Sequence, residues 1–178
     1  MSDHAETFIA HLIALKEKDH GAMAVLRHSL AFEPGAYVKA FAHVERFAKA
    51  SWHDNDARRL ALYAVAGLFA SHPKQRARSF AEAFGDLMRL RSSPGQPNKS
   101  IEGRFVALLG ADAENVVDYL RQAVSLLKSA DIGFDYAALL DDLFRWMSPA
   151  IDPKPVRQRW ARAFYRAAQA TPESIDAE

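Results

Sequence analysis

The chain has 178 residues, 49% of them hydrophobic, and a formal net charge of +1. This length and composition suit one domain or two small bundles and exclude a disordered chain. The absence of cysteine excludes disulfides, thiolate metal sites and cysteine nucleophiles, and it fits a reducing compartment. Residues 1–6 are polar, unlike a secretory signal, and the longest uncharged apolar run, residues 60–70, is shorter than the ~20 residues of a membrane span. We therefore expect a cytoplasmic protein with no membrane partner.

Hydrophobic residues recur at three- and four-residue spacing along most of the chain, which predicts an all-α protein of about eight or nine helices. No segment shows the two-residue alternation of a strand. The helices are predicted over residues 8–15, 23–30, 34–47, 54–72, 80–88, 101–109, 113–130, 134–147 and 152–170. The expected architecture is a compact protein of two packed helical bundles.

Two of these expectations are specific enough to test. Pro34 is expected to open the third helix, because proline suits a first helical turn, with Val38 facing inward. The next helix, capped by Asp54 or Asn55, is apolar nearly all round and ends at Pro73. A helix of that kind is expected at the centre of a bundle.

The clearest interruption of the helical pattern is a segment rich in Ser, Pro and Gly, residues 92–98. It predicts an N-terminal helical bundle over residues 1–91, a linker over 92–99 and a C-terminal helical bundle over 100–170. An acidic tail, residues 171–178, follows and is expected to be flexible.

The sequence contains no recognised catalytic motif. There is no HExxH, no glycine-rich phosphate loop and no GxSxG, so neither a metal site nor a cofactor is predicted. Asp141 and Asp142 are adjacent and point about 100° apart on a helix, so one of them is expected to pair with Arg145 rather than hold an ion. A metal-dependent nuclease using Asp131, Asp135, Asp141 or Asp142 is the enzymatic alternative.

Charge is unevenly distributed despite the small net value. Residues 153–171 include five basic side chains and no acidic one, whereas acidic residues collect in 112–118, 131–142 and 173–178. Such patches are either ordinary solvated helix faces or surfaces for a polyanion. On the last helix, Arg159, Arg162 and Arg166 share one stripe, and a rigid ridge of this kind can follow phosphates.

The opposite side of that last helix carries Trp160 and Phe164, which are expected to dock it to the core. A second set of basic residues flanks apolar seams elsewhere in the chain. Arg121 and Lys128 are seven residues apart and therefore share a helix face, although Asp118 can neutralise Arg121 at three-residue spacing.

Several short motifs occur in a recognisable order. They are residues 19–27 (DHGAMAVLR), 66–73 (AGLFASHP), 100–109 (SIEGRFVALL), 119–122 (YLRQ), 126–128 (LLK), 134–136 (FDY), 139–143 (LLDDL), 145–146 (RW) and 160–165 (WARAFY). Together, over roughly residues 8 to 167, they resemble the CasB family, the small subunit of the type I-E CRISPR complex Cascade. The chain departs from the family at Gly103, where members often carry a second basic residue.

The resemblance implies a non-catalytic, all-helical subunit, present in two head-to-tail copies and in contact with the large and backbone subunits of Cascade. It implies that basic residues hold the R-loop open by facing guide RNA, target DNA and the displaced strand. The nucleic-acid-binding residues it implies are Arg27, Lys99, Arg104, Arg121 and Lys128, together with the ridge of Arg159, Arg162 and Arg166. The alternative is a helical protein–protein adaptor without direct nucleic-acid contact.

Overall fold

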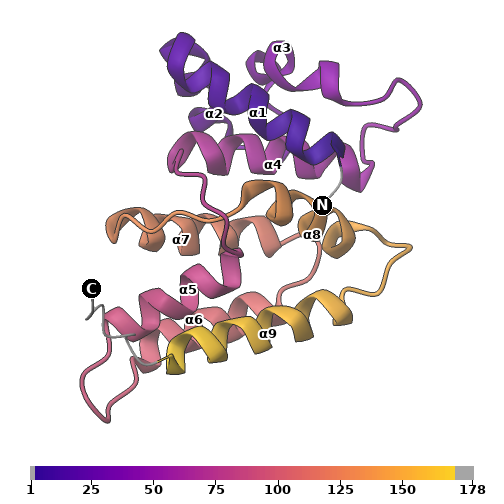
Figure 1. The fold of residues 1–178 in the computed structure, drawn as a ribbon. Helices are drawn as coiled ribbons and strands as arrows, with labels where there is room; N and C mark the ends of the chain where they lie inside the picture. The colour runs from indigo at the N-terminus through magenta and orange to yellow at the C-terminus, as the bar shows by residue number, and fades with distance from the viewer. Residues whose placement is uncertain (1–2, 171–178) are drawn as a thin grey trace.

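The computed structural model describes residues 3–170, and this part of the chain is built from helices and turns (Figure 1). The α-helices are α1 (Asp3–Lys18), α2 (His20–Ser29), α3 (Phe41–Val44), α4 (Ala57–Ser71), α5 (Phe80–Leu90), α6 (Lys99–Gly110), α7 (Val116–Ser129), α8 (Tyr136–Met147) and α9 (Lys154–Gln169). Two 3₁₀ turns, η1 (Val38–Ala40) and η2 (Glu45–Phe47), flank α3. The predicted all-α fold is confirmed, whereas the predicted acidic tail lies outside the described residues.

The helices stack in tiers (Figure 1). α1 to α4 form one end, α7 and α8 lie in the middle, and α5, α6 and α9 form the other end. The most extensive helix pair is α5 with α9, and α4 packs against α2, α7 and α8. Because α5 precedes residues 92–99 and yet packs against α9, the division of the chain into two bundles at that linker stays a prediction.

Helix α4 is the centre of the first tier, as its composition predicts. Twelve of its fifteen residues are buried, which an apolar surface all round allows. Its N-cap is Asp56, whose carboxylate accepts a hydrogen bond from the Arg58 amide, so the predicted caps one and two residues earlier are wrong. The helix ends at Ser71, before Pro73. Neither α4 nor any other helix within residues 3–170 is long and apolar enough to cross a membrane.

The segment after α2 differs from its predicted form. Pro34 lies in a turn rather than at a helix start, and Gly35 follows it with a positive φ of 83°. A positive φ interrupts right-handed helical geometry, so the chain enters only the short η1, α3 and η2. Val38 is 70% exposed, which contradicts its predicted inward orientation, whereas Val44 in the same segment is fully buried.

Residues 72–78, which lead from α4 toward α5, pass from the first tier to the other end of the molecule (Figure 1). On the way they cross residues 130–135, which join α7 to α8 within the middle tier. Three backbone N–H···O=C hydrogen bonds join them: Arg76 to Phe134 at 3.0 Å, Phe134 to Lys74 at 3.3 Å and Asp135 to Arg78 at 2.7 Å. Both segments are non-helical at the crossing, so their main-chain N–H and C=O groups have no partners within a helix. These hydrogen bonds satisfy them instead.

The crossing requires a residue without a side chain at position 133. A Cβ atom at Gly133 would lie 2.4 Å from the carbonyl oxygen of Lys74. Beside this contact, His72 Nε2 lies 2.8 Å from the Ile132 carbonyl oxygen, and the buried Tyr136 hydroxyl donates to the His72 carbonyl at 2.6 Å. The close backbone approach and the buried polar contacts therefore fix how the two connections pass each other.

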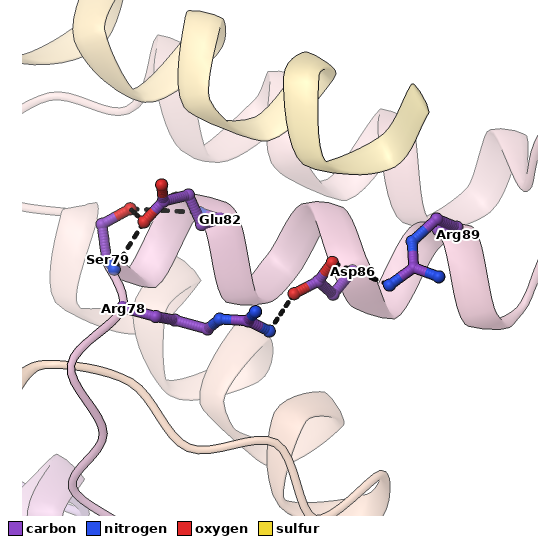
Figure 2. A network of polar contacts seen from close by, with 5 residues as sticks. All are labelled: Arg78, Ser79, Glu82, Asp86 and Arg89. Atoms are coloured by element: carbon purple, nitrogen blue, oxygen red, sulfur yellow. Dashed lines mark hydrogen bonds and ion pairs between the residues drawn. The ribbon is translucent and has the colours of Figure 1, made fainter. Parts of the chain in front are cut away.

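A polar network lies at the start of α5 and connects this helix to residues 72–78 (Figure 2). Ser79 and Glu82 form a reciprocal capping box, and the hydrogen bonds from Ser79 lower the pKa of Glu82. One turn later, the buried Asp86 binds Arg78 through one oxygen and Arg89 through the other, the latter at 3.0 Å. Asp86 thus binds one guanidinium group from α5 itself and one from the segment that precedes this helix.

Gly133→Ala is expected to lower the free energy of unfolding by about 1–3 kcal/mol, because the added methyl overpacks a backbone contact that cannot relax without opening the crossing. Urea denaturation measures this. Gly103→Ala is the matched control, since nothing lies within 4 Å of a Cβ there, and on α6 it should be neutral or stabilising. Equal stability of Gly133→Ala and wild type would contradict this role.

Asp86→Ala is expected to cost about 3 kcal/mol of unfolding free energy, because it leaves Arg89 as a partly buried, unpaired charge. Chemical denaturation again gives the measurement. Glu17→Ala provides the comparison: its carboxylate lies 3.6 Å from Lys16 Nζ with both side chains exposed, and such pairs contribute below about 1 kcal/mol. Similar losses in the two variants would show that the Asp86 network is not structural.

Candidate nucleic-acid interface

The eight predicted basic residues all lie on helices and fall into two groups. The first group comprises Arg27 on α2, Lys99 and Arg104 on α6, and Arg121 and Lys128 on α7. The second comprises Arg159, Arg162 and Arg166 on α9. Within residues 3–170, no hydrogen bond or ion pair connects the α9 arginines to the first group.

An open groove of about 400 Å³ lies between α6 and α7. Lys99 and Arg104 line it from α6, and Tyr119 and Gln122 line it from α7. Both cations are exposed, and neither makes a hydrogen bond or ion pair with a described residue. Gly103 leaves space between them, because nothing lies within 4 Å of a Cβ there. The groove thus presents two unpaired charges beside an aromatic ring and an amide.

The start of α6 places Lys99 at this groove. Asn98 caps the helix, and its side-chain oxygen accepts the Ile101 amide at 3.1 Å. Ile101 and Phe105 are buried and dock the helix, which turns Lys99 toward solvent. The first turn of a helix is electropositive, so the backbone here adds to the side-chain charge.

Arg27 and Arg121 are each held by a main-chain carbonyl. Arg27 Nε donates to the Ala70 oxygen at 3.0 Å, and Arg121 Nη1 donates to the Leu30 oxygen at 2.7 Å. The predicted neutralising partner Asp118 lies 3.8 Å from Arg121 Nη2. Both arginines remain exposed. Each therefore has a structural contact and further N–H donors that face solvent, because a guanidinium carries five.

Lys128 and a residue that the sequence did not single out complete this surface. Lys128 is exposed and has no hydrogen bond or ion pair within the described part of the chain. Next to it, Ser129 Oγ accepts a hydrogen bond from Arg91 Nη2 at 2.7 Å. Asn98 Nδ2 donates to the Arg91 carbonyl at 3.0 Å. Arg91 therefore connects the end of α7 to the start of α6, between Lys128 and the groove.

The ridge on α9 is only partly available. Arg159 binds the carboxylate of Asp142 on α8, which also accepts the Trp160 indole N–H at 2.7 Å. Arg162 is exposed with no hydrogen bond or ion pair among residues 3–170, and Arg166 is also exposed. The predicted docking by Trp160 is confirmed, since it is buried, as is Phe164. Arg159 therefore fixes α9 to α8, whereas Arg162 and Arg166 have no ion pair with a described residue and face solvent.

Three of the four carboxylates of the nuclease alternative serve packing and capping. Asp131 binds Lys74, which lowers the pKa of that carboxyl group. Asp135 caps α8, and Asp142 pairs with Arg145 at 3.9 Å as well as with α9. Among residues 3–170, no three His, Asp or Glu side chains lie close enough together to hold a metal ion.

Three residues of this surface were missed by sequence reasoning: Arg91, Tyr119 and Gln122. Tyr119 and Gln122 are three positions apart on α7, so their spacing alone predicts that they share one face of the helix. In the structure that face lines the groove. Arg91 could not have been found that way, because its partner Ser129 is 38 residues further along the chain.

The fold and this surface define a class, a small helical protein that presents exposed cations along a groove. Residues 22–165 match the family model of the CRISPR-associated protein Cse2. A CRISPR-associated protein Cse2 from Thermus thermophilus is 43% identical over 149 residues, which are 82% of this chain and 79% of that protein. The chain belongs to the CRISPR-associated Cse2 family, also named CasB, and the resemblance found in the sequence is confirmed.

Solved structures agree with this membership. The crystal structure of a Cse2-family protein from Thermus thermophilus has a TM-score of 0.77 at 40% identity, covering 93% of this chain and 99% of that one. The crystal structure of M. ruber CasB has a TM-score of 0.75 at 33% identity, covering 94% and 95%. A chain of a CRISPR RNA-guided surveillance complex shares the fold, with a TM-score of 0.77 at 23% identity over 93% of each chain.

Arg159→Ala is expected to lower the free energy of unfolding by about 1–2 kcal/mol, because Asp142 loses a charge-assisted hydrogen bond. Arg162→Ala, one turn further along α9, should change it by no more than about 0.5 kcal/mol. Thermal and urea unfolding of the two variants provide the comparison. A stability loss in Arg162→Ala as large as that in Arg159→Ala would contradict the assigned structural role.

Proposed function

We propose that this chain is the small, non-catalytic subunit of a type I-E CRISPR Cascade surveillance complex and stabilises the R-loop through its basic surface. The observation that carries the proposal is the groove between α6 and α7, where Lys99 and Arg104 face solvent with no hydrogen bond or ion pair to any residue of 3–170. Membership of the Cse2 family and the fold shared with a chain of an RNA-guided surveillance complex support it.

The binding chemistry follows from the side chains. Guanidinium and ammonium groups contact phosphates and release condensed counterions, which gives affinity without reading sequence. Base pairing between guide and target supplies the sequence specificity in RNA-guided systems. Formation of an R-loop is nearly balanced in free energy, so a few phosphate contacts that hold one strand can shift it substantially.

The spacing of the basic residues suits a nucleic-acid backbone. Arg121 and Lys128 are two helical turns apart, about 10 Å along α7, which corresponds to about three nucleotides of one duplex strand. Arg91 and the groove extend the basic surface from the end of α7 onto α6. A second copy packed head to tail, with the large and backbone subunits of Cascade, would continue the surface to guide RNA, target DNA and the displaced strand.

One observation favours the alternative, an adaptor that contacts protein alone. Leu90 is 63% exposed at the end of α5 and Val106 is 52% exposed on α6, so apolar side chains also reach the surface here. Gel shifts with single-stranded DNA at low and moderate salt, using the chain alone and in the assembled complex, distinguish the two functions. Cleavage of the same DNA, or of RNA, with magnesium or manganese would instead indicate the nuclease.

Lys128→Ala and Arg104→Ala are expected to lower R-loop yield in the assembled complex, and each should reduce the slope of log affinity against log salt by about one. Neither substitution removes a hydrogen bond or ion pair within residues 3–170, so the free energy of unfolding should be unchanged. Arg121→Ala should also lower the yield, but it additionally loses the Leu30 contact.

Lys18→Ala is the matched control for these variants, because Lys18 is an exposed cation at the end of α1, away from the groove. It should leave both R-loop yield and the salt slope at wild-type values. Wild-type yield and slope in the Lys128→Ala and Arg104→Ala complexes would overturn the proposed function of this surface.

A further inference from the structure

An exposed aromatic stack follows α2. Phe32 is 45% exposed, and its ring lies nearly parallel to that of Tyr37, with 4.8 Å between centroids and 15° between planes. His28 meets both rings edge-on, with centroids 5.6 Å from Phe32 and 5.1 Å from Tyr37. Tyr37 is half-buried and covers one face of Phe32, so the exposed area of Phe32 belongs to the opposite face and the ring edge.

The stack lies beside Arg121, one of the two carbonyl-bound arginines. Arg121 donates to the carbonyl of Leu30, two residues before Phe32. Phe32 and Tyr37 line one narrow pocket with Val117, which lies one turn before Arg121 on α7. The flat exposed ring and a cationic group with unused N–H donors are therefore neighbours on one surface.

The exposed ring is also held in place. The Phe32 amide donates to the Ser29 carbonyl at 3.0 Å, and the Ala36 amide donates to the Glu33 carbonyl at 3.0 Å, so the turn that carries the ring is hydrogen-bonded. A ring fixed by its turn and by Tyr37 loses little conformational freedom when it binds a ligand. Unpaired bases stack on such rings because every base has a π-face, whereas bases inside a duplex are already stacked.

We infer that Phe32, supported by Tyr37, is a stacking platform for an unpaired base of single-stranded nucleic acid, with Arg121 contacting the adjoining phosphate. Glu33 also lines the pocket, and its carboxylate repels phosphate. The phosphate is therefore expected on the side of Arg121, and the base on the Phe32 ring. The inference rests on the proposed function and adds a base contact to a surface that otherwise binds charge alone.

The test is fluorescence titration of the full chain with a short single-stranded DNA that contains 2-aminopurine, at several salt concentrations. Phe32→Leu keeps an apolar side chain but removes the ring, and affinity should fall about tenfold, as expected for loss of one base–aromatic stack. Phe32→Trp should keep wild-type affinity and the quenching that stacking causes. The salt slope should be unchanged in both variants, because no phosphate contact is lost.

Val38→Ala is the matched control, because Val38 is a 70% exposed apolar residue of the same segment, and it should bind DNA as wild type does. An abasic oligonucleotide should bind wild type as weakly as ordinary DNA binds Phe32→Leu. Wild-type affinity and quenching in Phe32→Leu, with weaker binding by Lys99→Ala, would overturn the platform and leave the proposed function standing.

Two further outcomes are separable from these. Phe32→Leu and Val38→Ala variants that bind DNA normally but enter the assembled complex poorly would overturn the platform and assign this surface to a protein partner. Absence of DNA binding by wild type, both alone and in the complex, would overturn the platform and the proposed function together.

Discussion

The hydrogen-bonded crossing of residues 72–78 with residues 130–135 is the contact on which the placement of the candidate surface depends. It joins the end of α7 to the segment that leads into α5, and Gly133 permits the close backbone approach. α7 also packs against α4 and α6. Arg121 is therefore brought to the Leu30 carbonyl that follows α2, and Ser129, next to Lys128, is brought to Arg91 at the α5–α6 connection, although neither pair is near in sequence.

The fold also determines which positive charges remain available. Between Lys74 and Arg104 the sequence has seven basic residues, and four of them bind protein side chains. These are Lys74 with Asp131, Arg78 and Arg89 with Asp86, and Arg91 with Ser129. Lys99 and Arg104 have no such partner in the described part of the chain and lie together in the groove. A nearly neutral chain can therefore present a locally basic surface, because acidic residues neutralise three of these structural cations and not the two in the groove.

Most helices were predictable because their signals are local: apolar spacing, prolines and polar caps. The segment after Pro34 was not, since a glycine with positive φ outweighed the helical pattern that followed it. The candidate site was predictable only as a set of residue types. The pair of Arg159 with Asp142 and the contact of Arg27 with the Ala70 carbonyl both depend on tertiary packing, so a helical wheel could not reveal them.

The carbonyl contacts of Arg27 and Arg121 give these arginines a structural role that is compatible with phosphate binding. A guanidinium that uses one N–H on a fixed carbonyl keeps its other donors in a defined direction, and a phosphate then meets a group that loses little side-chain freedom. A lysine at either position would keep the charge but lose this orientation. Lys99 and Lys128, without partners among residues 3–170, supply charge with freedom to move. The surface thus combines two oriented arginines with mobile cations, which suits a backbone whose path changes as strands separate.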